Sequence, residues 1–398
     1  MRQVIVSLTG VLCLFAFLCM LYLSRNPTRE FVIIPQRNSP ASALNQAYAV
    51  IGYVPDTENA KIEVSKFLYP SWLYSTRLPK DSPLYESLNR KKLSEPRRID
   101  LLLFMDPQAI KSNFMPGNCT VLSVRDPIVY SGVYTNEVAI GQEILDQIDS
   151  STSQSQCIVI PHDRPQQNFW QEHNYLFMYS IDFLGEVRYL ELIKSYALIL
   201  KIDVDSFISP SFPYWTPESF LSFGKGSYVH EDFTSNRLKM IAKKLGLRHR
   251  GLHNIGPAWF GQGQAIYDTA VLTVAIAKHF LLSEFPPEIP LEWSRWWKGV
   301  TSMYASELAL NHLFDSSELP SRTDTGFDEP SISSSSVWSI QQIHTWHIDG
   351  NFSKFVFKQG SYTKEQYPRS SLDVGKVKDY CMFIALYADD IIAEIEVY

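Results

Sequence analysis

The chain has few cysteines and no excess of positive charge. Five cysteines occur in 398 residues, and no two are spaced as CxxC, which argues against a zinc ribbon or a thioredoxin-like site. The 36 Lys and Arg residues are outnumbered by 42 Asp and Glu, so the net charge of -6 gives no electrostatic reason to expect nucleic-acid binding. Outside the N-terminal region, Cys119, Cys157 and Cys381 allow either one disulfide with a free thiol or three thiols.

Long uncharged apolar runs are also scarce, and Val4–Leu23 is the single example. It is long enough to cross a bilayer, which needs about 20 residues. A cleaved signal peptide is the alternative, but its apolar region is normally shorter, and Leu21–Ser24 is a poor cleavage site. We therefore predict a signal anchor at 4–23, after a cytoplasmic tail at 1–3 and before a proline-containing stem at 24–46 and a folded domain at 47–398.

The orientation in the membrane is not set by the basic residues, which flank the apolar run on both sides. Two glycosylation sequons, at Asn118 and Asn351, would be used if the folded domain is luminal. We therefore expect a single-pass type II protein of the Golgi or endoplasmic reticulum membrane.

The folded domain alternates between apolar segments and helical patterns, which favours an α/β fold with a mixed, mainly parallel sheet flanked by helices. The predicted strands are Tyr48–Val54, Ile99–Phe104, Thr120–Val124, Cys157–Ile160 and the segment that ends before Asp203. The predicted helices are Asn59–Tyr74, Phe169–Leu184, Val187–Tyr196, Ser235–Leu245, Gln264–Leu282 and Ser302–Phe314.

The most informative motif is Asp203-Val204-Asp205, which follows the apolar run from Ala197 to Ile202. Residues two apart in an extended chain point to the same side, so both carboxylates can reach one divalent ion. In parallel sheets, ligands bind beyond the carboxyl ends of the strands, which is where this pair would lie. The alternative is a strand-end turn with solvated carboxylates.

A second motif lies near the C-terminus, where an apolar stretch leads to His347, Gly350 and Lys354. Imidazole and carboxylates together suit Mn²⁺, and a lysine beyond the turn could pair with phosphate oxygens. His344 competes with His347 for the same role, and a hydrogen-bonded structural histidine is the alternative.

Two further segments carry polar side chains that suit sugar recognition. Asn254 and Gly256 lie in an aromatic segment, where an amide stands near open backbone; a tight turn is the alternative. Glu307 and Asn311 are four residues apart and share one face of a helix, where they could bind hydroxyl groups or be solvated. The Ser-, Asp- and Pro-rich segment Asp315–Ser336 is predicted to be a mobile loop, serving either as filler or as a lid over the substrate.

Together these motifs resemble the GT-A glycosyltransferases, in particular the retaining, glycogenin-like enzymes of glycosyltransferase family eight. That group has a strand running into DxD, then Asn-x-Gly, an acidic helix ending in Asn, and His-x-x-Gly followed by Lys. The order and rough spacing agree over Tyr189–Phe355, although the segment HIDGNFSKF has one extra residue before its lysine and lacks Pro-Trp. The resemblance implies a GT-A-like catalytic domain over 47–398 with a metal held by Asp203, Asp205 and His347.

The function that we expect from this resemblance is transfer of a sugar from a nucleotide-sugar donor to a glycan, protein or lipid acceptor. Mn²⁺ or Mg²⁺ on the DxD pair would bridge the diphosphate, and Lys354 would offset charge on the leaving group. Glu307 or Asp349 would be the base of an inverting reaction, although the resemblance leans towards retention. The alternatives are a non-catalytic luminal module that binds glycan or protein, and a hydrolase with paired carboxylates.

Overall fold

The computed structural model describes most of residues 43–396. Outside the described residues lie 1–42, 92–94, 113, 125–128, 131–132, 135–136, 165–167, 218–220, 287–291, 294, 316–317, 319–325, 347–349 and 397–398. The predicted tail, the apolar run at 4–23 and nearly all of the stem fall in this excluded part, so the anchor stays a prediction.

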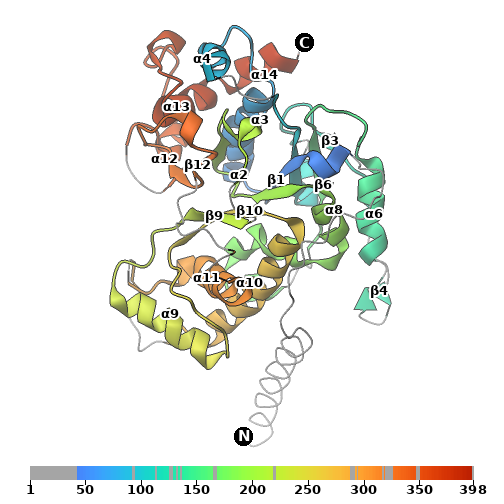
Figure 1. Ribbon diagram of the computed structural model, residues 1–398, viewed down its shortest axis with the longest axis vertical. Helices are drawn as coiled ribbons and strands as arrows, with labels where there is room; N and C mark the ends of the chain where they lie inside the picture. Colours follow the sequence, from blue (N-terminus) through green and yellow to red (C-terminus); the bar gives the residue numbers. More distant parts are fainter. Residues whose placement is uncertain are drawn as a thin grey trace, which may run out of the picture. The chain divides into compact units, whose positions relative to one another are not determined.

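A seven-stranded sheet forms the centre of the described residues (Figure 1). In spatial order its strands are β3 (Thr120–Val121), β6 (Cys157–Pro161), β2 (Ile99–Met105), β1 (Tyr48–Val54), β7 (Leu198–Lys201), β10 (Ile255–Gly261) and β9 (Leu221–Lys225). The first five are parallel, whereas β10 runs antiparallel to both β7 and β9. The predicted mixed, mainly parallel α/β fold is thus confirmed.

Strand β1 shows how the sequence divides the interior into two hydrophobic cores. Successive side chains of a strand point to opposite faces of the sheet. Accordingly, Ala49, Ile51 and Tyr53 enter one core, while Val50 and Val54 enter the other. Because every residue of β1 is buried, the strand is apolar throughout, as in sheets covered on both faces.

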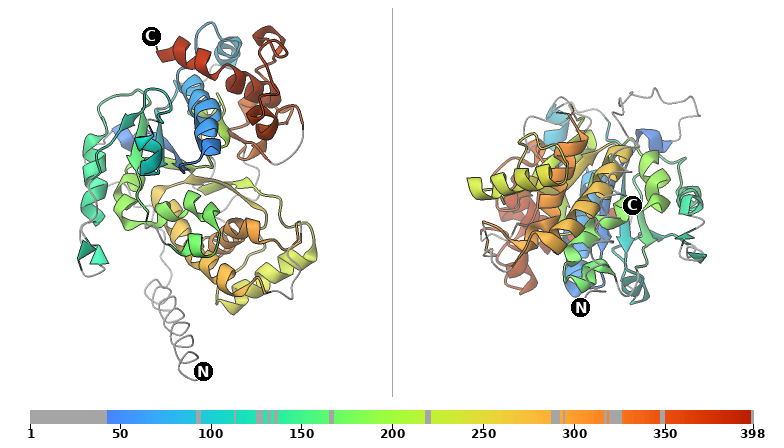
Figure 2. Two further views of the ribbon diagram at one scale, coloured as in Figure 1. Left: turned by 180° about the vertical axis from the view of Figure 1, so that it is seen from behind. Right: turned by 90° about the horizontal axis from the view of Figure 1, so that it is seen from below.

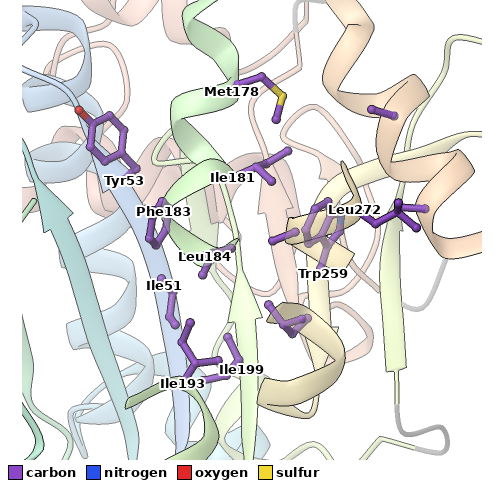
Figure 3. Packing of buried hydrophobic residues seen from close by; sticks show 14 of the residues in the cluster. Ile51, Tyr53, Met178, Ile181, Phe183, Leu184, Ile193, Ile199, Trp259 and Leu272 are labelled. Carbon is purple, nitrogen blue, oxygen red and sulfur yellow. The ribbon is translucent and has the colours of Figure 1, made fainter. Parts of the chain in front are cut away.

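The first core lies beneath helices that cover one face of the sheet. They are α6 (Glu137–Gln147), α8 (Leu190–Ser195), α9 (Asp232–Lys244), α10 (Gly263–Ser283) and α11 (Thr301–Leu313). Figure 3 shows Ile51 and Ile199 of the sheet beside Phe183, Leu184 and Ile193, which belong to this core. These helices bury apolar side chains in the first core, and α11 also buries the polar residues Glu307 and Asn311.

The opposite face is covered by N-terminal and C-terminal helices together (Figure 2). They are α2 (Glu58–Glu63), a π-helical turn (Val64–Leu68), α3 (Tyr69–Thr76), α13 (Val377–Leu386) and α14 (Ala388–Glu396). A small sheet in the order β11 (Glu329–Pro330), β12 (Gln342–His344) and β8 (Ser206–Ile208) lies on this side. In this sheet, β8, which follows Asp205 directly, pairs with β12 from the last quarter of the chain.

Shorter elements complete the described chain. They are α4 (Pro83–Lys91), α5 (Pro107–Lys111), α7 (Phe169–Glu172), α12 (Lys354–Lys358), the hairpin of β4 (Val129–Tyr130) and β5 (Val133–Tyr134), and 3₁₀ turns at Ala43–Gln46, Leu176–Ser180, Asp182–Gly185, Val187–Tyr189, Phe212–Tyr214, Lys298–Val300, Val337–Ser339 and Arg369–Ser371.

The segment predicted as one helix over Phe169–Leu184 is instead a short helix followed by 3₁₀ turns. Asn174 has a positive φ of 49°, which a continuous right-handed helix does not allow. The segment still buries Met178 and Phe183 in the first core, so the apolar pattern was read correctly and only the helical period was wrong.

Among the described residues, α10 alone is long and apolar enough to cross a membrane. Half of its most apolar window is buried within the fold, and α10 packs against α8 and α11. It is therefore a core helix of the domain.

One disulfide, Cys119–Cys157, joins the start of β3 to the start of β6, and Cys381 is a buried free thiol. This selects the first of the two alternatives that the cysteine count allows. Stable disulfides are typical of proteins that fold in an oxidising compartment.

Replacing Cys119 and Cys157 together by serine should lower the free energy of unfolding by about 4 kcal/mol, the chain-entropy value for a loop of this length. The cysteines are 38 residues apart in sequence. Urea unfolding of both chains without reductant measures the difference. Equal stability of the two chains would contradict the predicted stabilisation by the crosslink.

Candidate metal centre

Asp203 and Asp205, the acidic pair, lie at the point where the strand order of the sheet reverses. Strand β1 pairs with β2 on one side and with β7 on the other, all three in parallel. Asp203 and Asp205 follow the carboxyl end of β7. In open α/β sheets, ligands bind in the crevice at such a switch point, so the topology alone marks this edge as a binding site.

Three potential metal ligands meet there: Asp203, Asp205 and His344. One donor atom from each lies within 4.8 Å of the other two. The Nε2 atom of His344 is 3.3 Å from Oδ1 of Asp205. Asp205 is buried, whereas the Asp203 side chain is 34% exposed, so the group opens towards solvent on the Asp203 side.

The small sheet brings His344 to the acidic pair. Strand β12 pairs antiparallel with β8, and His344 lies opposite Ser206, the residue after Asp205. The Oγ1 atom of Thr345 donates to the carbonyl oxygen of Asp205 at 2.7 Å and fixes the register beyond the strand. The histidine in this group is thus His344, which the sequence analysis named as the alternative to His347.

Two lysines pair with the acidic pair. The ammonium group of Lys354 contacts Oδ2 of Asp205, and both side chains are largely buried. The ammonium group of Lys201 lies 3.1 Å from Oδ1 of Asp203 and also donates to the carbonyl oxygen of Pro257. Lys354 was expected near phosphate oxygens, and the structure places it beside the expected metal ligands.

The electrostatics of the group favour charged side chains in spite of burial. Burial acts to raise the pKa of Asp205, but His344 and Lys354 outweigh it and hold that pKa well below its usual range. Burial acts to lower the pKa of His344, but Asp205 and Asp328 together raise that pKa to about 10. At neutral pH, His344 is therefore an imidazolium between two carboxylates.

The charges of this group balance without a metal. Three carboxylates, from Asp203, Asp205 and Asp328, face the ammonium groups of Lys201 and Lys354 and the imidazolium of His344.

Two carboxylates and an imidazole are ligands that suit Mn²⁺, and the carboxylates suit Mg²⁺. A divalent ion that replaced the proton on His344 would leave the group with excess positive charge, which a bound polyanion would remove. The residues therefore fit a divalent ion that is bound together with an anion such as a diphosphate.

The other residues predicted from the C-terminal motif are only partly described. His347, predicted as a metal ligand, and Asp349 lie outside the described residues, and both roles stay predictions. Gly350 is exposed, and a Cβ at this position would overlap the side chain of Ile332. A packing requirement therefore accounts for this glycine.

Glu307 lies fully buried on α11 at the centre of a hydrogen-bond network. Its Oε1 accepts from His249 at 3.2 Å and from His253 at 2.6 Å, and its Oε2 accepts from the hydroxyl group of Tyr228 at 2.7 Å and the amide of Asn254 at 3.1 Å. Burial acts to raise the pKa of Glu307, but these donors outweigh it and lower that pKa. The network fastens the loop before β10 to α11.

This network also contains the second group of possible metal ligands, His249, His253 and Glu307. However, the amide of Gly251 donates to Nδ1 of His249, so the proton of a neutral His249 is on Nε2, where it is shared with Glu307. A metal at that position would have to displace this proton and break the bond from Gly251. The hydrogen-bonded arrangement is therefore sufficient without an ion.

Asn254, Gly256 and Asn311, predicted to bind substrate, have structural partners. The Oδ1 atom of Asn254 accepts from the amides of Tyr228 and Val229, and Asn254 has a positive φ of 60°. The side chain of Asn311 holds the loop backbone at residues 250 and 252. Gly256 leaves room for the carboxylate of Asp328. Sugar binding by these residues, and the catalytic role of Glu307, stay predictions.

Replacing Glu307 with Gln should destabilise the fold by about 3 kcal/mol at neutral pH, because Gln has one acceptor oxygen where Glu has two, so buried donors on one side of the network lose their acceptor and face an NH₂ group. A carboxyl group whose pKa is lowered by folding stabilises the fold above its unfolded value, here near 4.5, and loses this effect as the pH falls. The difference between wild type and Glu307→Gln should therefore shrink below about pH 4.5. Denaturant unfolding at pH 7 and pH 4 measures it, and a constant difference would contradict the assignment.

The segment predicted as a mobile loop is ordered in its second half, which corrects that prediction. Phe327 and Asp328 are buried, and β11 follows directly. Residues 316–317 and 319–325 lie outside the described part. Asp328 and Lys201 were not predicted as site residues, and no local motif marks either of them. Their contacts with the acidic pair and His344 arise only when distant strands pair.

Both predicted glycosylation acceptors are accessible. Asn118 and Asn351 are exposed, and Asn118 directly precedes the disulfide-bonded Cys119. Their modification is not shown by the fold and stays a prediction.

Comparison with known proteins gives a family but no established activity. No curated protein matches the chain. Among solved structures, the apo form of the bifunctional glycosyltransferase WbbM aligns with 87% of this chain and 51% of its own length, at 10% identity and a TM-score of 0.37. The chain thus spans about half the length of that protein, and so low a TM-score does not establish a shared fold. Residues 43–391 match the model of a domain of unknown function, DUF7164, and the chain belongs to that family.

Proposed function

We propose that this chain is a metal-dependent glycosyltransferase that moves a sugar from a nucleotide-sugar donor to a glycan, protein or lipid acceptor. The observation that carries the proposal is the group of Asp203, Asp205 and His344 at the switch point of the sheet, with Lys354 against Asp205. A group that is neutral when empty and gains positive charge when a dication replaces the proton on His344 suits a metal-bound diphosphate.

In this reaction, the residues of the group would hold the metal and stabilise the leaving diphosphate. Asp203, Asp205 and His344 would hold Mn²⁺ or Mg²⁺, and His347 stays an additional candidate. Such an ion supplies Lewis-acid stabilisation of a leaving diphosphate. Lys354 would turn from Asp205 to a phosphate oxygen, where its charge offsets the charge that develops on the leaving group. The fold gives no preference between inversion and retention.

We also propose that the domain is luminal and is held by the apolar run at 4–23 in the Golgi or endoplasmic reticulum membrane. The Cys119–Cys157 disulfide supports an oxidising compartment. The exposed sequons at Asn118 and Asn351 give a direct test. Treatment of the cell-expressed wild-type chain with an endoglycosidase should increase its gel mobility to that of the double Asn→Gln variant. An unchanged mobility of the treated wild-type chain would count against the luminal placement.

The activity is tested on the full chain, purified in detergent, with Mn²⁺ and a panel of nucleotide-sugars. We expect metal-dependent release of nucleoside diphosphate from at least one donor, which chelation abolishes. Nucleotide or glycan binding without turnover would instead favour a non-catalytic module. Release of sugar from glycans without a nucleotide donor would favour a hydrolase. Either result would overturn the proposed transfer reaction.

A further inference from the structure

Asp328 has a buried carboxylate that lies between strands β9 and β10 of the central sheet and the side chain of His344. Its side chain is 1% exposed, and its backbone has a positive φ of 55°. A non-glycine residue in this conformation costs of order 1–3 kcal/mol and persists only where its surroundings hold it. The Oε1 atom of Gln342 accepts from the backbone amide of Asp328 at 2.7 Å and provides part of that support.

Two glycines make room for this carboxylate. A Cβ at Gly224 of β9 or at Gly256 of β10 would overlap Oδ2 of Asp328. That oxygen accepts a hydrogen bond from the amide of Ala258 at 3.0 Å. The sheet is thus shaped to take the side chain of Asp328 at a position where any larger neighbour would exclude it.

The other oxygen of Asp328 points to His344. Among the described residues, Oδ1 is buried and has no hydrogen bond that meets normal geometry, but it lies 3.4 Å from Nδ1 of His344. The opposite ring nitrogen, Nε2, lies 3.3 Å from Oδ1 of Asp205. The three side chains therefore form a line, with the imidazole between a carboxylate fixed in the sheet and the acidic pair.

We infer that Asp328 is a positioning residue for the metal centre, an inference that rests on the proposed function. Through its ion pair with Nδ1, 3.4 Å away, its carboxylate keeps a proton on that nitrogen, so that Nε2 is the ring nitrogen that would give up its proton to a metal held by Asp203 and Asp205. Carboxylates behind ligating histidines act in this way, and their loss typically lowers metal affinity by 10- to 100-fold. Asp328 itself touches neither metal nor substrate.

The substitution Asp328→Asn separates this role from simple packing. The amide oxygen of Asn can still accept from Ala258, while its NH₂ group would face Nδ1 of His344 and donate to it. Nδ1 would then be an acceptor without a proton, the remaining ring proton would be on Nε2, and the metal would lose that ligand. The neighbouring variant Glu329→Gln removes a partly buried carboxylate that faces Ser335, and serves as the matched control.

The experiment measures binding of Mn²⁺ with inorganic pyrophosphate to the full chain by electron paramagnetic resonance. We expect a 10- to 100-fold loss of affinity in Asp328→Asn and wild-type affinity in Glu329→Gln. Wild-type affinity in Asp328→Asn would overturn the inference and leave the metal site intact. Absence of Mn²⁺ binding by the wild type would instead overturn the proposed function.

A second measurement tests the inference on the protein without metal, and decides it if the variant does not fold. Nitrogen NMR of ¹⁵N-histidine-labelled protein, with His344 assigned from a His344→Gln spectrum, reports for each ring nitrogen whether it carries a proton. The inference requires Nδ1 to be protonated in the wild type and, where the variant folds, to lose its proton in Asp328→Asn. A deprotonated Nδ1 in the wild type, or an unchanged spectrum in the variant, overturns it.

Discussion

Replacing Asp205 with Asn should abolish binding of Mn²⁺ with diphosphate and reduce donor turnover by at least about 100-fold, because the site loses the carboxylate that its other members surround. Asp205 contacts His344, Lys354 and the hydroxyl group of Thr345. The variant should also be less stable by about 3 kcal/mol, because the ammonium group of Lys354 is left buried without its anion.

Two controls separate loss of function from loss of folding. Asp203→Asn removes the partly exposed member of the pair and should lose the same metal binding with a smaller effect on stability. Asp389→Asn removes an exposed partner of Lys66 and should change neither. Calorimetric titration and urea unfolding of each variant give the two quantities. Undiminished metal binding in Asp205→Asn would rule out the centre described above.

Replacing Lys354 with Met should change the binding of the metal and of the metal–diphosphate pair in opposite directions. Without the ammonium group, Asp205 keeps its full charge for a cation, so Mn²⁺ alone should bind about tenfold more tightly. Diphosphate bound with the metal loses a charge-assisted hydrogen bond worth about 1.5–3 kcal/mol, so the pair should bind about 10- to 100-fold more weakly.

Opposite changes in the affinities for Mn²⁺ alone and for Mn²⁺ with diphosphate distinguish a phosphate-binding lysine from a purely structural one. A structural role for Lys354 predicts that both affinities fall together as the fold loosens. Lys364→Met, which removes an exposed partner of Asp390, is the control for loss of a lysine. Titrations of Mn²⁺ with and without inorganic pyrophosphate read both affinities from one preparation, and a parallel change of the two would refute the phosphate role.

The parts of the fold that the sequence predicted well are those encoded by local pattern. The runs at Tyr48–Val54 and Ile99–Phe104 are strands because they are apolar and bounded by turns, and the pattern at Gln264–Leu282 is a helix because it has the helical period. Asp203 and Asp205 could be placed at a strand end for the same reason. These elements need no knowledge of their partners.

The parts that were missed depend on pairing between distant segments. His344 reaches Asp205 through the pairing of β12 with β8, which joins segments more than a hundred residues apart. Asp328 lies in a segment whose composition is typical of a loop, and only the space above Gly224 and Gly256 gives it a buried place. Nothing in the local sequence specifies either contact.

The late position of β11 and β12 along the chain has a consequence for how the protein is made. All seven strands of the central sheet are complete by Gly261, yet the three cationic or carboxylate partners Asp328, His344 and Lys354 come afterwards. During synthesis, Asp205 therefore leaves the ribosome long before its cationic partners His344 and Lys354. A prematurely terminated chain that ends near 320 would contain every strand of that sheet and would keep Lys201 for Asp203, but Asp205 would lack both of its cationic partners.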